Sequence, residues 1–175
     1  TMARPIVLSN GRMHVGLNLY GEVHDFYYPH VGLENHAAAK SLRHRIGVHA
    51  DSWLSWLDDG NWQFIYDYQG GTLVGYIRAH NQARNITLEF EDCVDSEADA
   101  FLRNIQVINS SQDEREIKLF MQQVFDIVDG AGNGDTTQYL PHSHAIVHYS
   151  GRRSFLSGCV QTVSPDQCHH PTTGW

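Results

Sequence analysis

Histidine is the residue type that most invites a chemical role in this chain, with twelve among 175 residues. His142, His144 and His148 share one parity of an expected strand, and histidines two residues apart on a strand can both present nitrogens to zinc. At ~3.3 Å of rise per residue, His148 would lie too far along to close the same tetrahedron. We therefore expect solvated histidines and no bound metal. A small metal-binding protein that uses His142 and His144 stays as an alternative.

Carboxylates gather between residues 89 and 99, and paired acids can do general acid–base work. Such work requires a cleft that sets their pKa values apart, whereas acids at a strand end and turn are more often a solvated rim. The chain contains no Gly-x-Ser-x-Gly nucleophile motif and no phosphate-binding glycine loop. The sequence therefore predicts no catalytic residue in this chain alone, and no cofactor.

Segment 20–36 concentrates tyrosines, histidines, glycines, Pro29 and Asn35 in a stretch that is neither a good strand nor a good helix throughout. Aromatic faces beside Asn and His donors suit sugar binding, because rings stack on C–H faces while polar groups bind hydroxyls. Most aromatic side chains are packing residues, so the residues alone favour a structural loop. Both interpretations stay open on this ground.

The same segment carries a family resemblance. Its motifs are Asn10-Gly11, Gly21, Asp25, Tyr27-Tyr28-Pro29, Val31-Gly32 and Glu34-Asn35-His36. Together they resemble the N-terminal domain of prokaryotic glucoamylases of glycoside hydrolase family fifteen, whose relatives include glucodextranases and some bacterial trehalases. The similarity covers most of residues 5–158 and is most specific from Tyr-Tyr-Pro to Asn-His. Residues 168–175 have no counterpart in it.

The resemblance implies a large antiparallel β-sandwich followed by a linker and an (α/α)6 barrel. Two glutamates of that barrel hydrolyse terminal α-glucosidic bonds with inversion, a chemistry that places acid and base ~6.5–9.5 Å apart. On this interpretation both glutamates lie beyond Trp175, so none transfers to this chain. The expected partners are the barrel of the same polypeptide and an α-glucan or α-glucoside substrate. A stand-alone carbohydrate-binding module is the main alternative.

The resemblance also places loop 27–36 beside the barrel, as a substrate-rim or domain-docking element built from Tyr28, Pro29, Asn35 and His36. We expect this loop to present Tyr28, Asn35 or His36 at the surface. Replacing Asn35 or His36 by Ala should then change the stability of the isolated domain by only ~0.5 kcal/mol or less.

Composition narrows the class of protein. A diffuse net charge of −8 argues against nucleic acid or anionic membrane as a partner. Three widely spaced cysteines fit free thiols in a reducing compartment better than a disulfide framework. No apolar run approaches the ~20 residues of a membrane span. We therefore expect a cytoplasmic protein.

The elements that must position these residues follow a period of two. Ile86, Leu88 and Phe90 alternate with polar residues, and 117–127, 62–68 and 101–107 behave in the same way. The pattern predicts an all-β fold, a large antiparallel sandwich over residues 1–163 with a tail at 164–175. Asp59-Gly60 and Gly70-Gly71 predict hairpins in a meander. One exception is 34–42, where an alanine run predicts a short helix.

Overall fold

The computed structural model describes residues 4–37, 44–127 and 134–162. These residues form thirteen β-strands and one short 3-10 helix. The strands are β1 (Ile6–Ser9), β2 (His14–Leu17), β3 (Val23–Tyr27), β4 (Arg45–Ala50), β5 (Trp53–Trp56), β6 (Gln63–Tyr68), β7 (Gly75–Asn81), β8 (Ile86–Val94), β9 (Phe101–Asn109), β10 (Ile117–Gln122), β11 (Thr136–Leu140), β12 (Ala145–Ser150) and β13 (Arg153–Gly158), and the 3-10 helix η1 spans Pro141–Ser143. The all-β expectation is confirmed. In the described residues no helix is long and apolar enough to cross a membrane.

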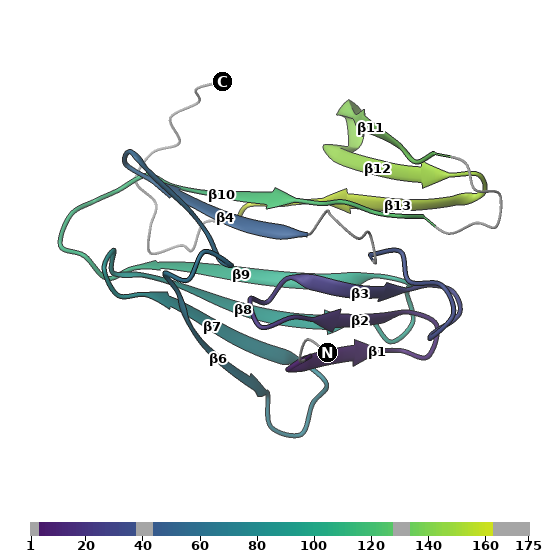
Figure 1. Ribbon diagram of the computed structural model, residues 1–175, viewed down its shortest axis with the longest axis horizontal. Helices are drawn as coiled ribbons and strands as arrows, with labels where there is room; N and C mark the ends of the chain where they lie inside the picture. Colours follow the sequence, from purple (N-terminus) through teal and green to yellow (C-terminus); the bar gives the residue numbers. More distant parts are fainter. Residues whose placement is uncertain (1–3, 38–43, 128–133, 163–175) are drawn as a thin grey trace.

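The strands form four antiparallel sheets, in the orders β1-β2-β3, β10-β4-β5, β6-β7-β8-β9 and β11-β12-β13. Figure 1 shows β10, β4 and the β11-β12-β13 sheet along one side and the β1-β2-β3 and β6-β7-β8-β9 sheets along the opposite side. The chain therefore builds a stack of sheets, which is the sandwich arrangement that the period of two favours.

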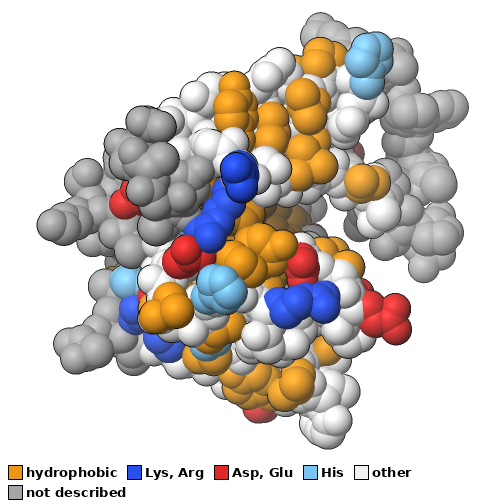
Figure 2. Space-filling model, turned by 90° about the vertical axis from the view of Figure 1, so that its right-hand side faces the viewer, with side chains coloured by type: hydrophobic (Ala, Val, Ile, Leu, Met, Phe, Trp, Pro, Cys, Tyr) orange, Lys and Arg blue, Asp and Glu red, His pale blue; other side chains and the backbone are white. Residues whose placement is uncertain are grey.

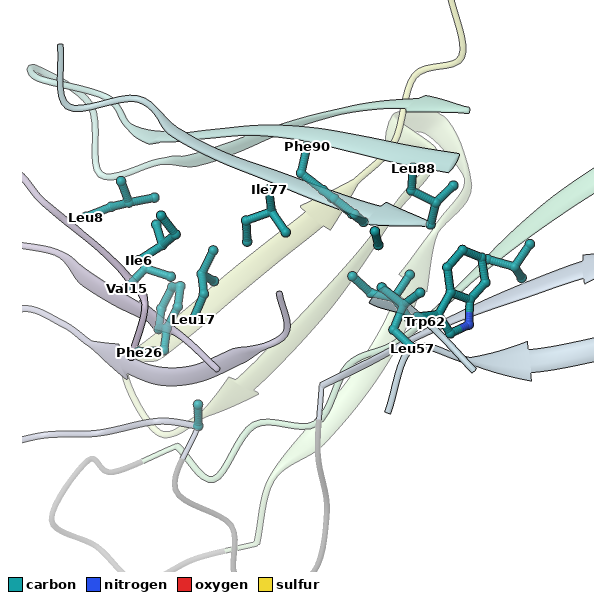
Figure 3. Close-up of a cluster of buried hydrophobic side chains, with 14 of the residues drawn as sticks. Ile6, Leu8, Val15, Leu17, Phe26, Leu57, Trp62, Ile77, Leu88 and Phe90 are labelled. Atoms are coloured by element: carbon teal, nitrogen blue, oxygen red, sulfur yellow. The ribbon is translucent and has the colours of Figure 1, made fainter. Parts of the chain in front are cut away.

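The main core lies between β1-β2-β3 and the face of β7 and β8. Ile77, Leu88 and Phe90 are fully buried; Ile77 lies nearest the side chains of the first three strands, and Leu88 lies toward Leu57 and Trp62 (Figure 3). Full burial of one such side chain contributes about 1.5–3 kcal/mol. A Cβ added at Gly75 would lie 2.5 Å from Cγ2 of Ile6, so the crossing of β1 over β7 depends on that glycine.

A buried ion pair ties β8 and β9 to the turn between β2 and β3. Arg103 donates from Nε and Nη2 to the two carboxylate oxygens of Asp92 at 2.7 Å each, and Nη2 also donates to the carbonyl oxygen of Gly21 at 2.8 Å. Asp92 is fully buried. Bidentate geometry with a further hydrogen bond offsets the cost of removing both charges from water.

An acid is also buried at this turn. Glu22 is 1% exposed and accepts at Oε2 from Asn18 Nδ2 at 3.0 Å, while its Oε1 has no hydrogen-bond partner among the described residues. Burial raises the pKa of Glu22 to about 7, the Asn18 hydrogen bond opposes the rise, and the charge of Asp58 adds to it. The protonated form of Glu22 is therefore the one that the interior favours.

An aromatic and histidine cluster fastens the β11-β12-β13 sheet to the body. The ring of Phe125 lies 5.1 Å from that of Phe155 in a stacked arrangement and 4.9 Å from those of both His44 and His148. Burial lowers the pKa of His148, and burial followed by the charges of His148 and Arg103 lowers that of His44 to about 4. Both imidazoles are thus neutral packing partners near neutral pH.

Three local expectations are wrong. Segments 53–57 and 62–68 do not form a hairpin at Asp59-Gly60, because β5 pairs with β4 and β6 pairs with β7 in a different sheet. The strand expected over 117–127 ends at Gln122. The helix expected over 34–42 is absent from its first four residues, which form an isolated bridge at Asn35 and a turn, and the remainder lies outside the described residues, as does the tail at 164–175.

Candidate docking face around loop 28–36

Asn35 is the residue that shapes the loop after β3. Its Oδ1 accepts hydrogen bonds from the backbone N–H groups of Phe26 (3.0 Å) and Ala37 (3.1 Å), and its Nδ2 donates to Oδ1 of Asp25 at 2.9 Å. Its backbone bridges to Tyr27 as a single antiparallel pair. One amide side chain therefore pins the returning end of the loop onto the strand that it left.

Asp25 continues this network toward the N-terminal segment. Arg4 donates from Nε to Oδ2 of Asp25, and Nη2 of Arg4 lies 2.7 Å from Nδ1 of His24. Burial opposes ionisation of Asp25, but the hydrogen bonds from Arg4, His24 and Asn35 outweigh it and hold the pKa below its usual range. Asp25 is thus a carboxylate engaged on all sides rather than a proton donor.

His36 lies in the interior, with no exposed surface. Its Nε2–H donates to the carbonyl oxygen of Tyr28 at 2.6 Å, and its backbone N–H donates to that of Phe26 at 2.8 Å. Its ring lies 4.9 Å from that of Phe155. Burial lowers the pKa of His36, and the Tyr28 hydrogen bond works against that shift. The expectation that His36 is available at the surface is wrong.

Tyr28 and Pro29 are half-buried and joined by a cis peptide bond. The Tyr28 hydroxyl donates to Oδ2 of Asp99 at 3.1 Å, and Arg12 Nε donates to Oδ1 of the same carboxylate at 2.8 Å. The hydrogen bond to Asp99, followed by burial, raises the pKa of Tyr28, and the Arg12 hydrogen bond lowers that of Asp99. The loop is therefore fastened to the turn before β9 as well as to β3.

A third ion pair fastens the loop to the small sheet. Arg153, the first residue of β13, lies with Nη2 2.7 Å from Oε2 of Glu34. Figure 2 shows this end of the molecule, where hydrophobic side chains are bordered by basic, acidic and histidine side chains. Asp25, Asp99 and Glu34 thus each lie beside an arginine on this face.

The exposed part of the loop is its tip, residues 30–33. Leu33 is 81% exposed and Val31 43% exposed, whereas Asn35 is half-buried. Sequence reasoning passed over Val31 and Leu33 because apolar residues are normally assigned to the core. The signal that could have found them is their position on either side of Gly32, in a segment without regular alternation.

The histidines singled out for metal do not share a strand. His142 lies in η1, His144 follows it in the left-handed conformation at φ 46°, and only His148 lies within β12. His148 faces the aromatic cluster and Nδ1 lies 3.1 Å from the Thr137 hydroxyl. Among the described residues no three His, Cys, Asp or Glu side chains gather as metal ligands.

The comparison with curated proteins finds one relative of note. The chain is 24% identical over 162 residues to an uncharacterized glycosyl hydrolase, MJ1610, of Methanocaldococcus jannaschii. The match takes in 93% of this chain but 25% of that protein, so the chain spans about a quarter of the relative's length. No family model matches the chain. No solved structure matches it either.

Proposed function

We propose that this chain is the accessory N-terminal β-sandwich of a glucoamylase-like glycoside hydrolase that cleaves terminal α-glucosidic bonds with inversion. In this proposal the chain packs against a catalytic (α/α)6 barrel of the same polypeptide and helps to shape the mouth of its active site. The likeness to a glycosyl hydrolase of which the matched region makes up 25% supports a hydrolase parent. The bond type and the barrel come from the motif resemblance at Tyr27-Tyr28-Pro29 and Glu34-Asn35-His36.

The observation that carries the proposal is the way loop 28–36 is built. Hydrogen bonds and ion pairs through Asn35, Asp99 and Arg153 hold its base against three separate elements. The same construction leaves Val31 and Leu33 exposed at the tip. A rigidly held loop that presents apolar side chains to solvent is typical of a preorganised contact surface. We therefore assign the docking contact to the tip of the loop, and Tyr28, Asn35 and His36 hold the base of the loop in place.

The proposal is tested by comparing the natural full-length polypeptide with the 175-residue chain. Purified full-length protein should release glucose from one or more of maltose, isomaltose, starch and trehalose, and the chain alone should release none. Turnover by the isolated chain that disappears when one of its own acids is replaced would contradict the accessory role.

A double substitution at the tip sharpens the test. Val31→Ser with Leu33→Ser should lower kcat/KM of the full-length protein by about tenfold if the tip holds the barrel in place, since lost interface contacts cost ~1–2 kcal/mol. Leu73→Ser is the matched control, because Leu73 is 75% exposed in the turn before β7. Equal activity of both variants would remove the tip from the function.

A sugar-binding module is the second candidate, favoured by the outer face of the β10-β4-β5 sheet. Trp56, Gly47 and Phe120 lie in one cross-strand row, and the Trp56 ring lies over the bare backbone of Gly47. Phe120 is 45% exposed, while the guanidinium of Arg45 covers the Trp56 ring at 4.4 Å. Titration of the isolated chain with maltooligosaccharides, beside Phe120→Ala, decides whether this row binds sugar. Saturable binding that Phe120→Ala abolishes would favour the module.

A further inference from the structure

The outward face of the β11-β12-β13 sheet carries no charge. The register places three cross-strand rows on it, Thr136–Tyr149–Ser154, Gln138–Val147–Leu156 and Leu140–Ala145–Gly158, although Ala145 in the third row is itself buried. Leu156 is 64% exposed and Tyr149 38% exposed. The opposite face holds His148 and Phe155, both buried against the body. An antiparallel sheet with one face in water normally carries polar and charged side chains on that face.

The outer face of the β6-β7-β8-β9 sheet shows what a solvated face of this molecule looks like. Its central rows are Ile65–Arg78–Glu89–Gln106 and Asp67–Tyr76–Glu91–Asn104. Four of these eight side chains are charged. Arg153 is the one charged residue within β11, β12 and β13, and it lies beside Glu34 rather than on the outward face. Depletion of charge together with exposed leucine and tyrosine distinguishes the centre of a protein interface.

The edges of the β11-β12-β13 sheet also carry few of the features that keep a sheet solvated. β11 and β13 are its two outer strands; both lack the lysines and prolines that normally discourage pairing at a sheet edge, and the one inward charge, Arg153 on β13, is paired with Glu34. Tyr139 on β11 and Ile146 on β12 are 56% and 40% exposed, beyond the part of the sheet that the aromatic cluster covers. A three-stranded sheet with apolar residues open on two faces is an incomplete layer.

We infer that the outward face of β11-β12-β13, centred on Val147, Tyr149 and Leu156, is covered by a further segment of the same polypeptide. The inference rests on the proposed function, in which this chain is one part of a longer polypeptide. The glycosyl hydrolase relative extends well beyond the quarter of its length that this chain matches. We take the occupant to be the corresponding further part of this polypeptide. An uncharged face suits an apolar protein segment and offers nothing to bind an anionic lipid surface. A second copy of this acidic chain would bring together two net charges of −8. A tethered segment has a high effective concentration and needs no such encounter.

The test is amide hydrogen exchange on the full-length polypeptide and on the 175-residue chain under the same conditions. Amides of β12 and β13 should exchange at least about tenfold more slowly in the full-length protein, because covered strands open only with their partner. Leu156→Lys should remove most of that protection in the full-length protein and leave the 175-residue chain folded. Ile65→Lys is the matched control, since Ile65 is 59% exposed on an edge strand of the charged face.

The outcomes separate this inference from the proposed function. A full-length protein that hydrolyses α-glucosides while β12 and β13 exchange as fast as in the short chain overturns the inference alone. Protected strands in a full-length protein without glycosidase activity support the inference and overturn the proposed function. Protection of β12 and β13 in the 175-residue chain that disappears on dilution would identify a second copy as the occupant. A parent gene that encodes no further domain would exclude a covering segment of the same polypeptide. Either result overturns the inference.

Discussion

Replacement of Asn35 by Ala is the sharpest probe of how the candidate docking face is held. The change removes an acceptor shared by the backbone N–H groups of Phe26 and Ala37 and a donor to Asp25. Each backbone donor left without a partner costs ~1–3 kcal/mol when buried, and Asn35 is half-buried, so water recovers part of this. We expect a loss of ~2–3 kcal/mol in the free energy of unfolding.

Urea melts of the 175-residue chain measure this loss as a shift of the midpoint at unchanged slope. His30→Ala is the matched control, because His30 is exposed at the loop tip, and its effect should stay within ~0.5 kcal/mol. Asn35→Asp keeps the acceptor but sets a second carboxylate against Asp25, so it should cost more at pH 7 than at pH 4.

The result for Asn35→Ala decides between two views of the loop. A change below ~0.5 kcal/mol, as the sequence predicts for a surface residue, would refute the view that Asn35 pins the loop. A loss of ~2–3 kcal/mol that comes with a changed slope of the urea melt would mean that the native or denatured state had changed its compactness. The loss could then not be assigned to the hydrogen bonds of Asn35.

Three further predictions follow from buried groups. The pKa of Glu22 is raised from 4.5 to about 7, so its contribution to the free energy of unfolding is complete below pH 4.5 and is lost as pH rises through 7. Glu22→Gln should therefore remove a decline of roughly 3 kcal/mol from the stability measured by urea melts across this pH range. Identical pH profiles of the two proteins would contradict the assignment. The pKa of His44 is lowered from 6.5 to about 4, so its contribution to the free energy of unfolding is complete above pH 6.5 and is lost as pH falls through 4. His44→Phe should flatten the acid side of the same stability profile. An unchanged acid side would contradict the neutral, buried state of His44. Gly75→Ala should lower stability by ~1–3 kcal/mol through overlap with Ile6, while Gly70→Ala, with open space around it, should not; equal thermal midpoints would show that β1 can shift freely.

Much of the strand content could be predicted from the sequence because alternation is a local property. The structure buries Ile86, Leu88 and Phe90 completely within β8, as the alternation predicts, although Thr87 between them is buried as well. The hairpin at Gly70-Gly71 is also confirmed, since β6 and β7 pair on either side of it. β1 and β11 were missed.

The sequence misjudged how deeply the residues of the expected docking loop are buried. Tyr28, Asn35 and His36 lie in one loop, but the ring of His36 is buried against Phe155 and Asn35 binds the backbone of β3. Polar residue type favours exposure only as a tendency. Whether a given His or Asn points outward depends on which hydrogen-bond partners the fold brings near it.

The sequence by itself determined the class of fold, since a period of two over many short segments without helical stretches leaves stacked antiparallel sheets as the way to bury apolar faces. It also determined where the chain bends, through Gly, Asn and Asp turns. Only the tertiary structure decided that β5 joins β4 and that β6 begins another sheet, because the same Asp59-Gly60 turn serves a hairpin or a crossing equally well. It also decided which faces meet. The uncharged face of β11-β12-β13 and the charged face of β6-β7-β8-β9 both alternate along the chain, and the difference between them emerges only when the register sets their side chains side by side.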